Sequence, residues 1–336
     1  MHLITFIHHT GDWSDLWIKK VFVVELILLV ASYPLCLLCI YLLFFTKQYH
    51  PNLGILMKHV FVQYPFQMAA RIVLIIKMFL ESEETLKDDP VFTIACCVRS
   101  YLIFIAFYFS IFAMIERVFA TVYLKDYENK QRKSIGYILT ILMHTVSYMS
   151  ASFFVLEVIS VWPILISFVF TNALSFVLCH ITALLNQKKF EECVDSFSAT
   201  SHYNLSERYQ LAENLAVTTL FKKGIVLFIF FSLLCCSFMS AEEIDNDVYL
   251  RNWLHVSFNI SAALYGILTP LALFHYNEEW RIGVKKLWAR IRHNEVEPER
   301  SLSRMGDPVA DARLATERYF SQLAKDWGMD ARYLEV

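Results

Sequence analysis

Long runs of apolar residues, separated by short polar segments, dominate the pattern along this chain. A helix rises 1.5 Å per residue and the hydrocarbon core of a bilayer is about 30 Å thick, so one crossing needs about 20 mostly apolar residues. Seven runs meet this requirement, at residues 21–45, 60–80, 95–124, 135–158, 161–185, 224–241 and 253–275, with a start near Val91 as the alternative for the third. The pattern predicts an all-α, polytopic membrane protein whose seven-transmembrane helix bundle occupies residues 1–280.

The fourth and fifth runs are almost continuous in sequence. Residues 135–185 contain a single charged side chain, Glu157. As one helix this stretch would be about 76 Å long, far more than a bilayer needs. We therefore expect two spans joined by a very short turn, with the turn chemistry at Ser160 and Trp162-Pro163.

The segment after the last run, residues 281–336, is predicted to be a cytoplasmic tail with two helices. Around its start, apolar residues recur at helical spacing opposite basic ones, a pattern typical of an amphipathic helix on the inner leaflet. The apolar positions are Phe274, Trp280, Val284, Leu287, Trp288 and Ile291. Farther on, Asp307 as N-cap, Pro308 at the first helical position and Gly328 after the end indicate a second short helix.

The composition agrees with a membrane protein and excludes other classes. Hydrophobic residues make up 57% of the 336 positions and charged residues 18%, against about 45–50% and about 25% in soluble domains. The formal net charge of -2 provides no basic field, so we expect no nucleic-acid partner. Most of the eight cysteines lie in or beside apolar runs, which indicates packing residues rather than a disulfide framework; among them are Cys36, Cys39, Cys96, Cys97, Cys235 and Cys236.

Lys and Arg in the connecting segments predict the orientation. Segments 46–59, 125–134, 186–223 and 276–292 together contain sixteen of them, whereas the segments on the other side contain four. Basic residues accumulate in cytoplasmic loops, so the N-terminus is expected outside and the C-terminus in the cytoplasm. Lys19 and Lys20 beside the first run oppose this assignment, but the total number of Lys and Arg on each side decides it.

The sequence carries no motif of an intramembrane enzyme. It has no Asp inside any run, no His-Glu-x-x-His and no Gly-x-Ser-x-Gly. Cys36 and Cys39 have the spacing of a metal or redox pair, but they lie within an apolar run without a second Cys or His pair nearby. We therefore predict a non-enzymatic protein without cofactor or metal.

Charged side chains inside the runs are candidates for function, because each costs about 2.5–3.5 kcal/mol at the centre of a membrane helix. Arg71 lies about 14 Å from the outer end of the second run, so it needs either a ligand or a buried partner such as Glu25. Gln63 and Gln67 share its helix face at i−8 and i−4. Arg71, Gln63, Gln67 and Arg99 are thus candidate ligand-binding residues, with snorkelling to the interface as the alternative for Arg99.

Glu116 and Arg117 lie at the cytoplasmic end of the third run. An acid beside an arginine can pair in a resting state and separate when helices move, which makes this pair a candidate switch. The alternative is a pair of interface charges solvated by lipid headgroups. Before the sixth run, Asn204 followed three residues later by Glu207 forms a capping box. The helix is therefore expected to begin well inside the cytoplasm, where Asn204 would escape glycosylation.

Two segments resemble a known receptor family. These are IERVFATVYLKDYE at residues 115–128, which closes the third run, and LSERYQLAENL at residues 205–215, which precedes the sixth. They are similar to the nematode serpentine receptors of class epsilon, a chemoreceptor family, and the resemblance extends from the first run to Trp280. One departure is Ala216, which stands where members often carry a basic residue soon after the Glu-Asn pair.

The resemblance implies a chemosensory receptor of the G-protein-coupled type in the plasma membrane or sensory cilia. Its expected partners are a small-molecule ligand bound in the outer half of the bundle, a cytoplasmic heterotrimeric G protein and the lipid bilayer. The alternatives are a seven-span ligand-gated cation channel with inverted topology and a scaffold or trafficking protein without a ligand. The distribution of Lys and Arg opposes the channel.

Overall fold

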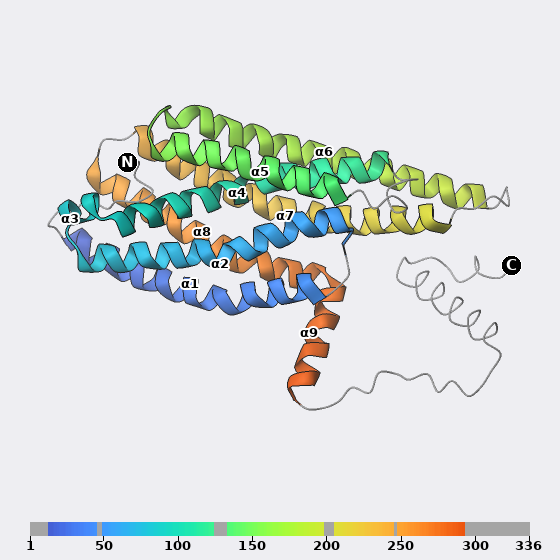
Figure 1. The fold of residues 1–336 in the computed structure, drawn as a ribbon, viewed down its shortest axis with the longest axis horizontal. Helices are drawn as coiled ribbons and strands as arrows, with labels where there is room; N and C mark the ends of the chain where they lie inside the picture. Colours follow the sequence, from blue (N-terminus) through green and yellow to red (C-terminus); the bar gives the residue numbers. More distant parts are fainter. Residues whose placement is uncertain (1–12, 46–48, 124–132, 198–204, 245–246, 293–336) are drawn as a thin grey trace. The chain divides into compact units, whose positions relative to one another are not determined.

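The computed structural model describes residues 13–45, 49–123, 133–197, 205–244 and 247–292 (Figure 1). Within these ranges the chain forms helices and no strands. The helices are α1 (Trp13–Phe45), α2 (Pro51–Leu80), α3 (Glu83–Asp88), α4 (Pro90–Val122), α5 (Lys133–Val155), α6 (Val161–Phe197), α7 (Leu205–Ile244), α8 (Val248–Tyr276) and α9 (Glu278–Ile291). The predicted cap Asn204 and the predicted second tail helix lie outside the described residues.

Seven of the described helices, α1, α2 and α4 to α8, are long and apolar enough to cross a membrane, which confirms the predicted seven-helix fold. Two of them are much longer than a bilayer requires. The 37 residues of α6 and the 40 of α7 correspond to about 55 and 60 Å. Both helices extend past the others at the end opposite α3 (Figure 1).

Side-chain caps fix where two of the spans begin. The Asp89 carboxylate accepts a hydrogen bond from the backbone N–H of Val91 (2.9 Å), and Pro90 occupies the first turn. The third span therefore starts several residues before the predicted position 95. Lys77 lies 2.7 Å from the same carboxylate and lowers its pKa. Asp247 caps α8 in the same way, through the N–H of Tyr249 (3.0 Å).

The turn between α5 and α6 occupies residues 156–160. Glu157 at its centre has φ 55°, a left-handed conformation that lets the chain reverse within a few residues. Pro163 lies in the first turn of α6, where its missing N–H leaves no helical hydrogen bond unmade. The short connection brings the end of α5 next to the start of α6, and beyond the turn both helices pack against α4.

Helix α4 is the central helix of the bundle. It packs against α2, α5, α6 and α7, and 61% of its span is buried, compared with 33–39% for the other six spans. Its aromatic side chains form much of the largest core cluster, in which Phe107 stacks on Phe168 of α6 with ring centroids 4.5 Å apart. Residues on α4 can therefore contact most of the bundle.

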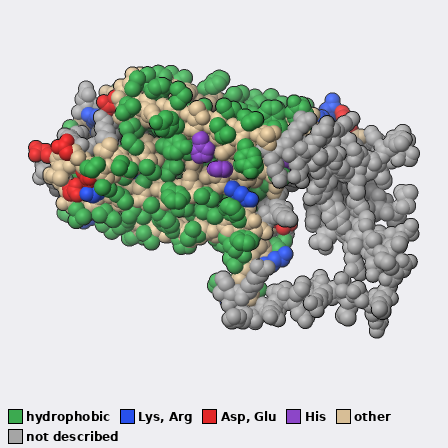
Figure 2. Space-filling view, viewed as in Figure 1, with side chains coloured by type: hydrophobic (Ala, Val, Ile, Leu, Met, Phe, Trp, Pro, Cys, Tyr) green, Lys and Arg blue, Asp and Glu red, His purple; other side chains and the backbone are tan. Residues whose placement is uncertain are grey.

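The outer surface of the bundle is apolar, as a lipid environment requires. Figure 2 shows hydrophobic side chains over most of the visible bundle surface and acidic side chains gathered at the end that carries α3. Many large apolar side chains are more than half exposed, among them Ile141 (64%), Ile166 (65%) and Phe170 (65%). Such exposure would be unfavourable in water but is suited to acyl chains.

One close helix contact depends on a glycine. Helices α2 and α5 meet where the N–H of Gly136 donates to the Oδ1 of Asn52 (3.3 Å). A Cβ atom at position 136 would lie 2.9 Å from the Asn52 Cα, so a larger residue would force the helices apart. Small residues allow this kind of close approach between membrane helices.

Contacts divide the chain into two units, residues 1–284 and 285–336. In the first unit, Trp280 at the start of α9 is fully buried against Phe61 and Phe274. Its backbone N–H donates to the Asn277 side chain (3.3 Å), which in turn donates to the Tyr49 hydroxyl (3.0 Å). In the second unit, the last turns of α9 are described up to residue 292.

The seven described cysteines are all free. Cys36 and Cys39 are buried and belong to different core clusters, so the structure uses them as small packing residues.

Candidate functional site

A buried ion pair lies near the end of α4 opposite α3. Arg117 donates through Nε to Glu116 Oε2 (2.6 Å) and through Nη2 to Glu116 Oε1 (2.9 Å). Both side chains are almost completely buried, with relative exposures of 1% and 0%. Two charges removed from water need each other and further hydrogen bonds, so this pair depends on the helices around it.

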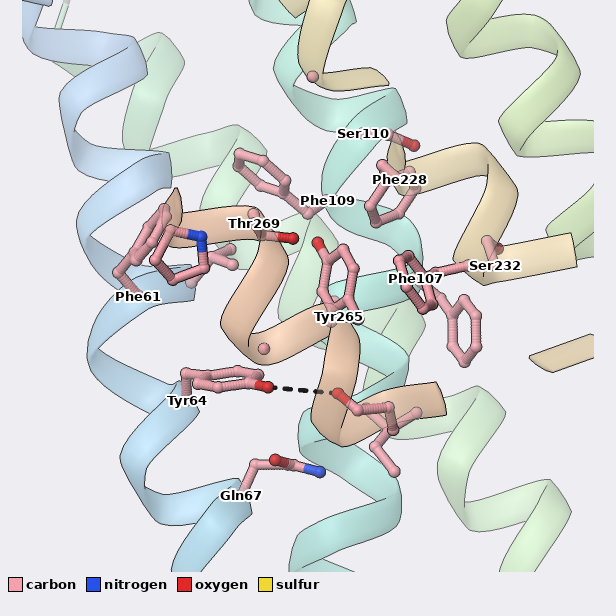
Figure 3. Close-up of a pocket in the computed structure, with 18 of the residues that line it drawn as sticks. Phe61, Tyr64, Gln67, Phe107, Phe109, Ser110, Phe228, Ser232, Tyr265 and Thr269 are labelled. Atoms are coloured by element: carbon pink, nitrogen blue, oxygen red, sulfur yellow. Dashed lines mark hydrogen bonds between the residues drawn. The ribbon is translucent and has the colours of Figure 1, made fainter. Parts of the chain in front are cut away.

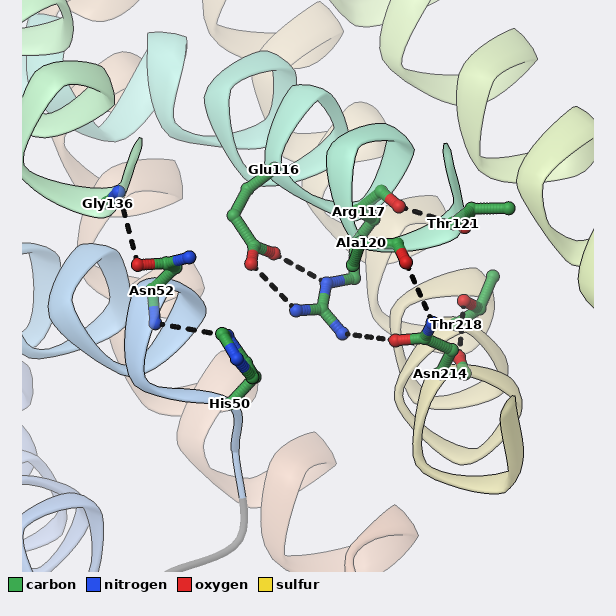
Figure 4. A network of polar contacts seen from close by, with 9 residues as sticks. All are labelled: His50, Asn52, Glu116, Arg117, Ala120, Thr121, Gly136, Asn214 and Thr218. Atoms are coloured by element: carbon green, nitrogen blue, oxygen red, sulfur yellow. Dashed lines mark hydrogen bonds and ion pairs between the residues drawn. The ribbon is translucent and has the colours of Figure 1, made fainter. Parts of the chain in front are cut away.

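Asn214 on α7 supplies such a hydrogen bond. Arg117 Nη1 donates to Asn214 Oδ1 (3.2 Å), and Asn214 Nδ2 donates to the carbonyl of Ala120 (3.5 Å). Thr218, one turn farther along α7, donates its hydroxyl to the Asn214 carbonyl (2.6 Å). Figure 4 shows Arg117 between Glu116 on its own helix and Asn214 on the facing helix. The polar group formed by Glu116, Arg117 and Asn214 therefore joins α4 to α7, and we call it the α4–α7 latch.

A cavity of about 170 Å³ lies between α1, α2, α4, α7 and α8 (Figure 3). Its wall is mainly aromatic and aliphatic, and the described residues that line it include no Asp, Glu, Lys, Arg or His. The aromatic lining residues are Phe61, Tyr64, Phe107, Phe109, Phe221, Phe228, Phe231, Phe258 and Tyr265. An apolar pocket with a few polar groups is the usual form of a small-molecule site.

Most polar groups in the cavity wall already have partners. The Tyr64 hydroxyl donates to the carbonyl of Ala262 (3.4 Å), as Figure 3 shows. Ser110 pairs with Ser175 (3.1 Å), and Ser232 accepts from Asn172 (2.8 Å). The hydroxyls of Tyr265 and Thr269, one turn apart on α8, point toward each other (Figure 3).

Gln63 differs from these groups. Its side chain is 9% exposed, it lines the cavity, and both its amide nitrogen and its amide oxygen lack a hydrogen-bond partner. Gln67, one turn away on α2, also lines the cavity and is 7% exposed. A buried amide without partners is rare in folded proteins and calls for an explanation.

The cavity lies closer to the latch than the outer-half position expected from the sequence. Its wall on α4 runs from Leu102 to Ser110, and Ser110 precedes Glu116 by six residues, or about 9 Å. The region nearer α3 is filled by a core cluster that includes Phe22, Met68 and Phe92.

Comparison with known proteins identifies the family. A model described as "Sre G protein-coupled chemoreceptor" matches residues 5–328, nearly the whole chain. The chain belongs to the Sre chemoreceptor family. This result confirms the resemblance to class epsilon serpentine receptors stated above.

Named relatives come from Caenorhabditis elegans. Serpentine receptor class epsilon-8 is 27% identical over 315 residues, covering 90% of this chain and 89% of that protein. Serpentine receptor class epsilon-13 is 25% identical over 331 residues, with 91% and 90% covered. The protein is thus a multi-pass membrane receptor of the chemosensory, G-protein-coupled type, and its family is one of receptors rather than enzymes.

In this Sre receptor the two predicted arginines lie outside the cavity wall. Arg71 forms a bidentate ion pair with Glu25 of α1, with Nε–Oε1 and Nη2–Oε2 distances of 2.6 and 2.8 Å, and both side chains are 1% exposed. Arg99 of α4 donates to Asn259 of α8. Of the four candidate ligand residues, the structure brings Gln63 and Gln67 together at the cavity.

Sequence reasoning did not single out Asn214 or the aromatic wall. Asn214 lies inside the LSERYQLAENL segment that carries the family resemblance, so that segment was the feature of the sequence that could have identified it. Phe107, Phe228 and Tyr265 belong to runs in which nearly every residue is apolar, and there no contrast distinguishes a cavity wall from a lipid-facing surface.

Proposed function

We propose that this Sre receptor binds a small molecule in the cavity and signals through a heterotrimeric G protein at the end of the bundle that carries the latch. The observation that supports this most directly is the position of Arg117, which holds Glu116 on α4 and Asn214 on α7 at the same time. Receptor signalling requires an element with two arrangements that a ligand can bias, and the latch is such an element.

Helix α7 connects the cavity to the latch. It carries Asn214 and Thr218, and within the next two turns it lines the cavity through Leu220, Phe221 and Gly224. A ligand that shifts this part of α7 also moves Asn214 relative to Arg117. The projecting ends of α6 and α7 then give a partner a surface that reports the movement.

The free energy of the Arg117–Asn214 hydrogen bond is of the right size for a switch. A hydrogen bond to a charged group contributes about 1.5–3 kcal/mol, which corresponds to a population change of about 10- to 150-fold. A small ligand that favours the open arrangement by this amount would shift the receptor between mostly resting and mostly active states.

Removing the amide of Asn214 tests the proposal. In Asn214→Leu the bond from Arg117 is lost, so we expect ligand-independent second-messenger output to rise at least several-fold in a reporter cell, normalised to surface level. Asn172→Leu is the matched control, because it removes another buried interhelical asparagine bond, to Ser232, without touching the latch. Unchanged basal output in Asn214→Leu, with normal surface level, would contradict the switch.

The same proposal requires one orientation of the chain in the membrane. We propose that the α3 end faces outward, in the plasma membrane or a sensory cilium, and that the latch end faces the cytoplasm. A cysteine introduced at exposed Ser82 should react with a membrane-impermeant maleimide on intact cells, whereas one at exposed Lys188 should react only after permeabilisation. The reverse labelling would support the inverted arrangement required by the channel alternative.

A further inference from the structure

Two described side chains of the cavity wall have buried polar atoms without a hydrogen-bond partner: Thr269 through its hydroxyl, and Gln63 through both atoms of its amide. Gln63 is more than nine-tenths buried, and neither atom of its amide has a hydrogen-bond partner. Tyr64, Ser110 and Ser232, which share the wall, each have one. An amide that offers both a donor and an acceptor inside an apolar space is suited to a ligand that carries a complementary group.

The charge of the site restricts the ligand further. Within the part of the chain that the structure describes, no Asp, Glu, Lys, Arg or His lines the cavity. Arg71, which could have attracted an anion from deeper in the bundle, is neutralised by Glu25 through two short hydrogen bonds. An ion in this cavity would be desolvated without a counter-charge, which is strongly unfavourable.

We propose that the cavity binds a neutral, mainly apolar organic molecule whose hydroxyl or carbonyl group hydrogen-bonds to the Gln63 amide. This inference rests on the proposed function, because it names the ligand class of the same site. The cavity volume of about 170 Å³ is similar to that of an engineered apolar cavity, about 150 Å³, that accepts benzene. A ligand about the size of a substituted benzene ring therefore fits, and the aromatic wall suits it.

Gly224 offers a way to close the cavity without disturbing the backbone. It lines the cavity from α7, and a Cβ atom built on it meets no other atom within 4 Å. A leucine at this position therefore has open space to occupy, and because Gly224 lines the cavity we expect its side chain to fill part of the ligand site. Gly54 of α2 also has no neighbour within 4 Å but lies outside the cavity wall, so Gly54→Leu is the matched control.

The experiment uses the full-length receptor in lipid nanodiscs and three probes of similar size: benzyl alcohol, ethylbenzene and benzoate. Binding is measured by ligand-observed NMR as the difference from empty nanodiscs. We expect wild-type receptor to prefer benzyl alcohol over ethylbenzene and to reject benzoate. Gln63→Leu should lower the affinity for benzyl alcohol about tenfold, which is the effect of one lost hydrogen bond. Ethylbenzene should bind to this variant at least as tightly as to the wild type. Gly224→Leu should abolish specific binding, and Gly54→Leu should not.

Other outcomes overturn the inference in distinguishable ways. If Gln63→Leu leaves the preference for benzyl alcohol unchanged, the amide is satisfied by water and does not recognise the ligand. If benzoate binds best, or if no probe binds, the neutral ligand class is wrong. If binding survives Gly224→Leu, the probes occupy another site. The proposed signalling function would fail separately, through normal basal output in Asn214→Leu.

Discussion

Arg117→Ala is expected to silence the receptor, reducing agonist-stimulated output to less than a tenth of wild type at equal surface level. We infer that the Arg117 side chain separates from Asn214 on activation and contacts the G protein. The alanine variant lacks this side chain and therefore cannot make that contact. Glu116→Gln is expected to have the opposite effect. It removes the charge that holds Arg117 at 2.6 Å and should raise basal output several-fold. Both effects are measured as second-messenger level per receptor at the surface.

Folding must be separated from signalling in this test. Arg117→Ala leaves the Glu116 carboxylate buried without its partner, which can cost about 3–5 kcal/mol. The double variant Glu116→Gln with Arg117→Gln removes both charges and keeps two hydrogen-bonding amides of similar size. We expect it to reach the surface and remain silent. A normal agonist response from either variant would disprove the role of Arg117.

Breaking the Glu25–Arg71 pair is expected to destabilise the bundle by about 3–5 kcal/mol, because each single variant leaves a buried charge uncompensated. Glu25→Gln or Arg71→Gln should lower the surface level strongly and reduce the melting temperature of the purified receptor. The exchange of both residues, Glu25→Arg with Arg71→Glu, should restore a large part of the stability. The partly exposed Lys77–Glu81 pair is the control, since Glu81→Gln removes this pair alone and should change stability by less than about 1 kcal/mol.

The ligand response decides whether Arg71 is structural. Because neither Glu25 nor Arg71 lines the cavity, the exchanged receptor should respond to ligand with unchanged sensitivity. If the exchanged receptor folds, reaches the surface and loses its response, Arg71 contacts the ligand, and the cavity between α1, α2, α4, α7 and α8 is not the complete site.

Helix number could be predicted from the sequence because the bilayer imposes a length of about 20 apolar residues that local composition reveals. Helix ends were less predictable. Helix α7 begins at Leu205, directly after the predicted cap position 204, so its early start was predicted by the capping pattern and not by the apolar run from 224 to 241. The start of α4 depended on the Asp89 cap, which hydropathy does not detect.

The sequence by itself determined that this protein is a seven-helix membrane receptor of the Sre family and that a few buried charges need partners. Tertiary structure alone decided which partners they have. Hydropathy and helical periodicity describe one helix at a time, whereas the Glu25–Arg71 pair joins positions 46 residues apart and the Arg117–Asn214 bond positions 97 apart. The cavity is also a property of several helices at once, because its wall and the lipid-facing surface are equally apolar. Only packing distinguishes a phenylalanine that faces Gln63 from one that faces lipid.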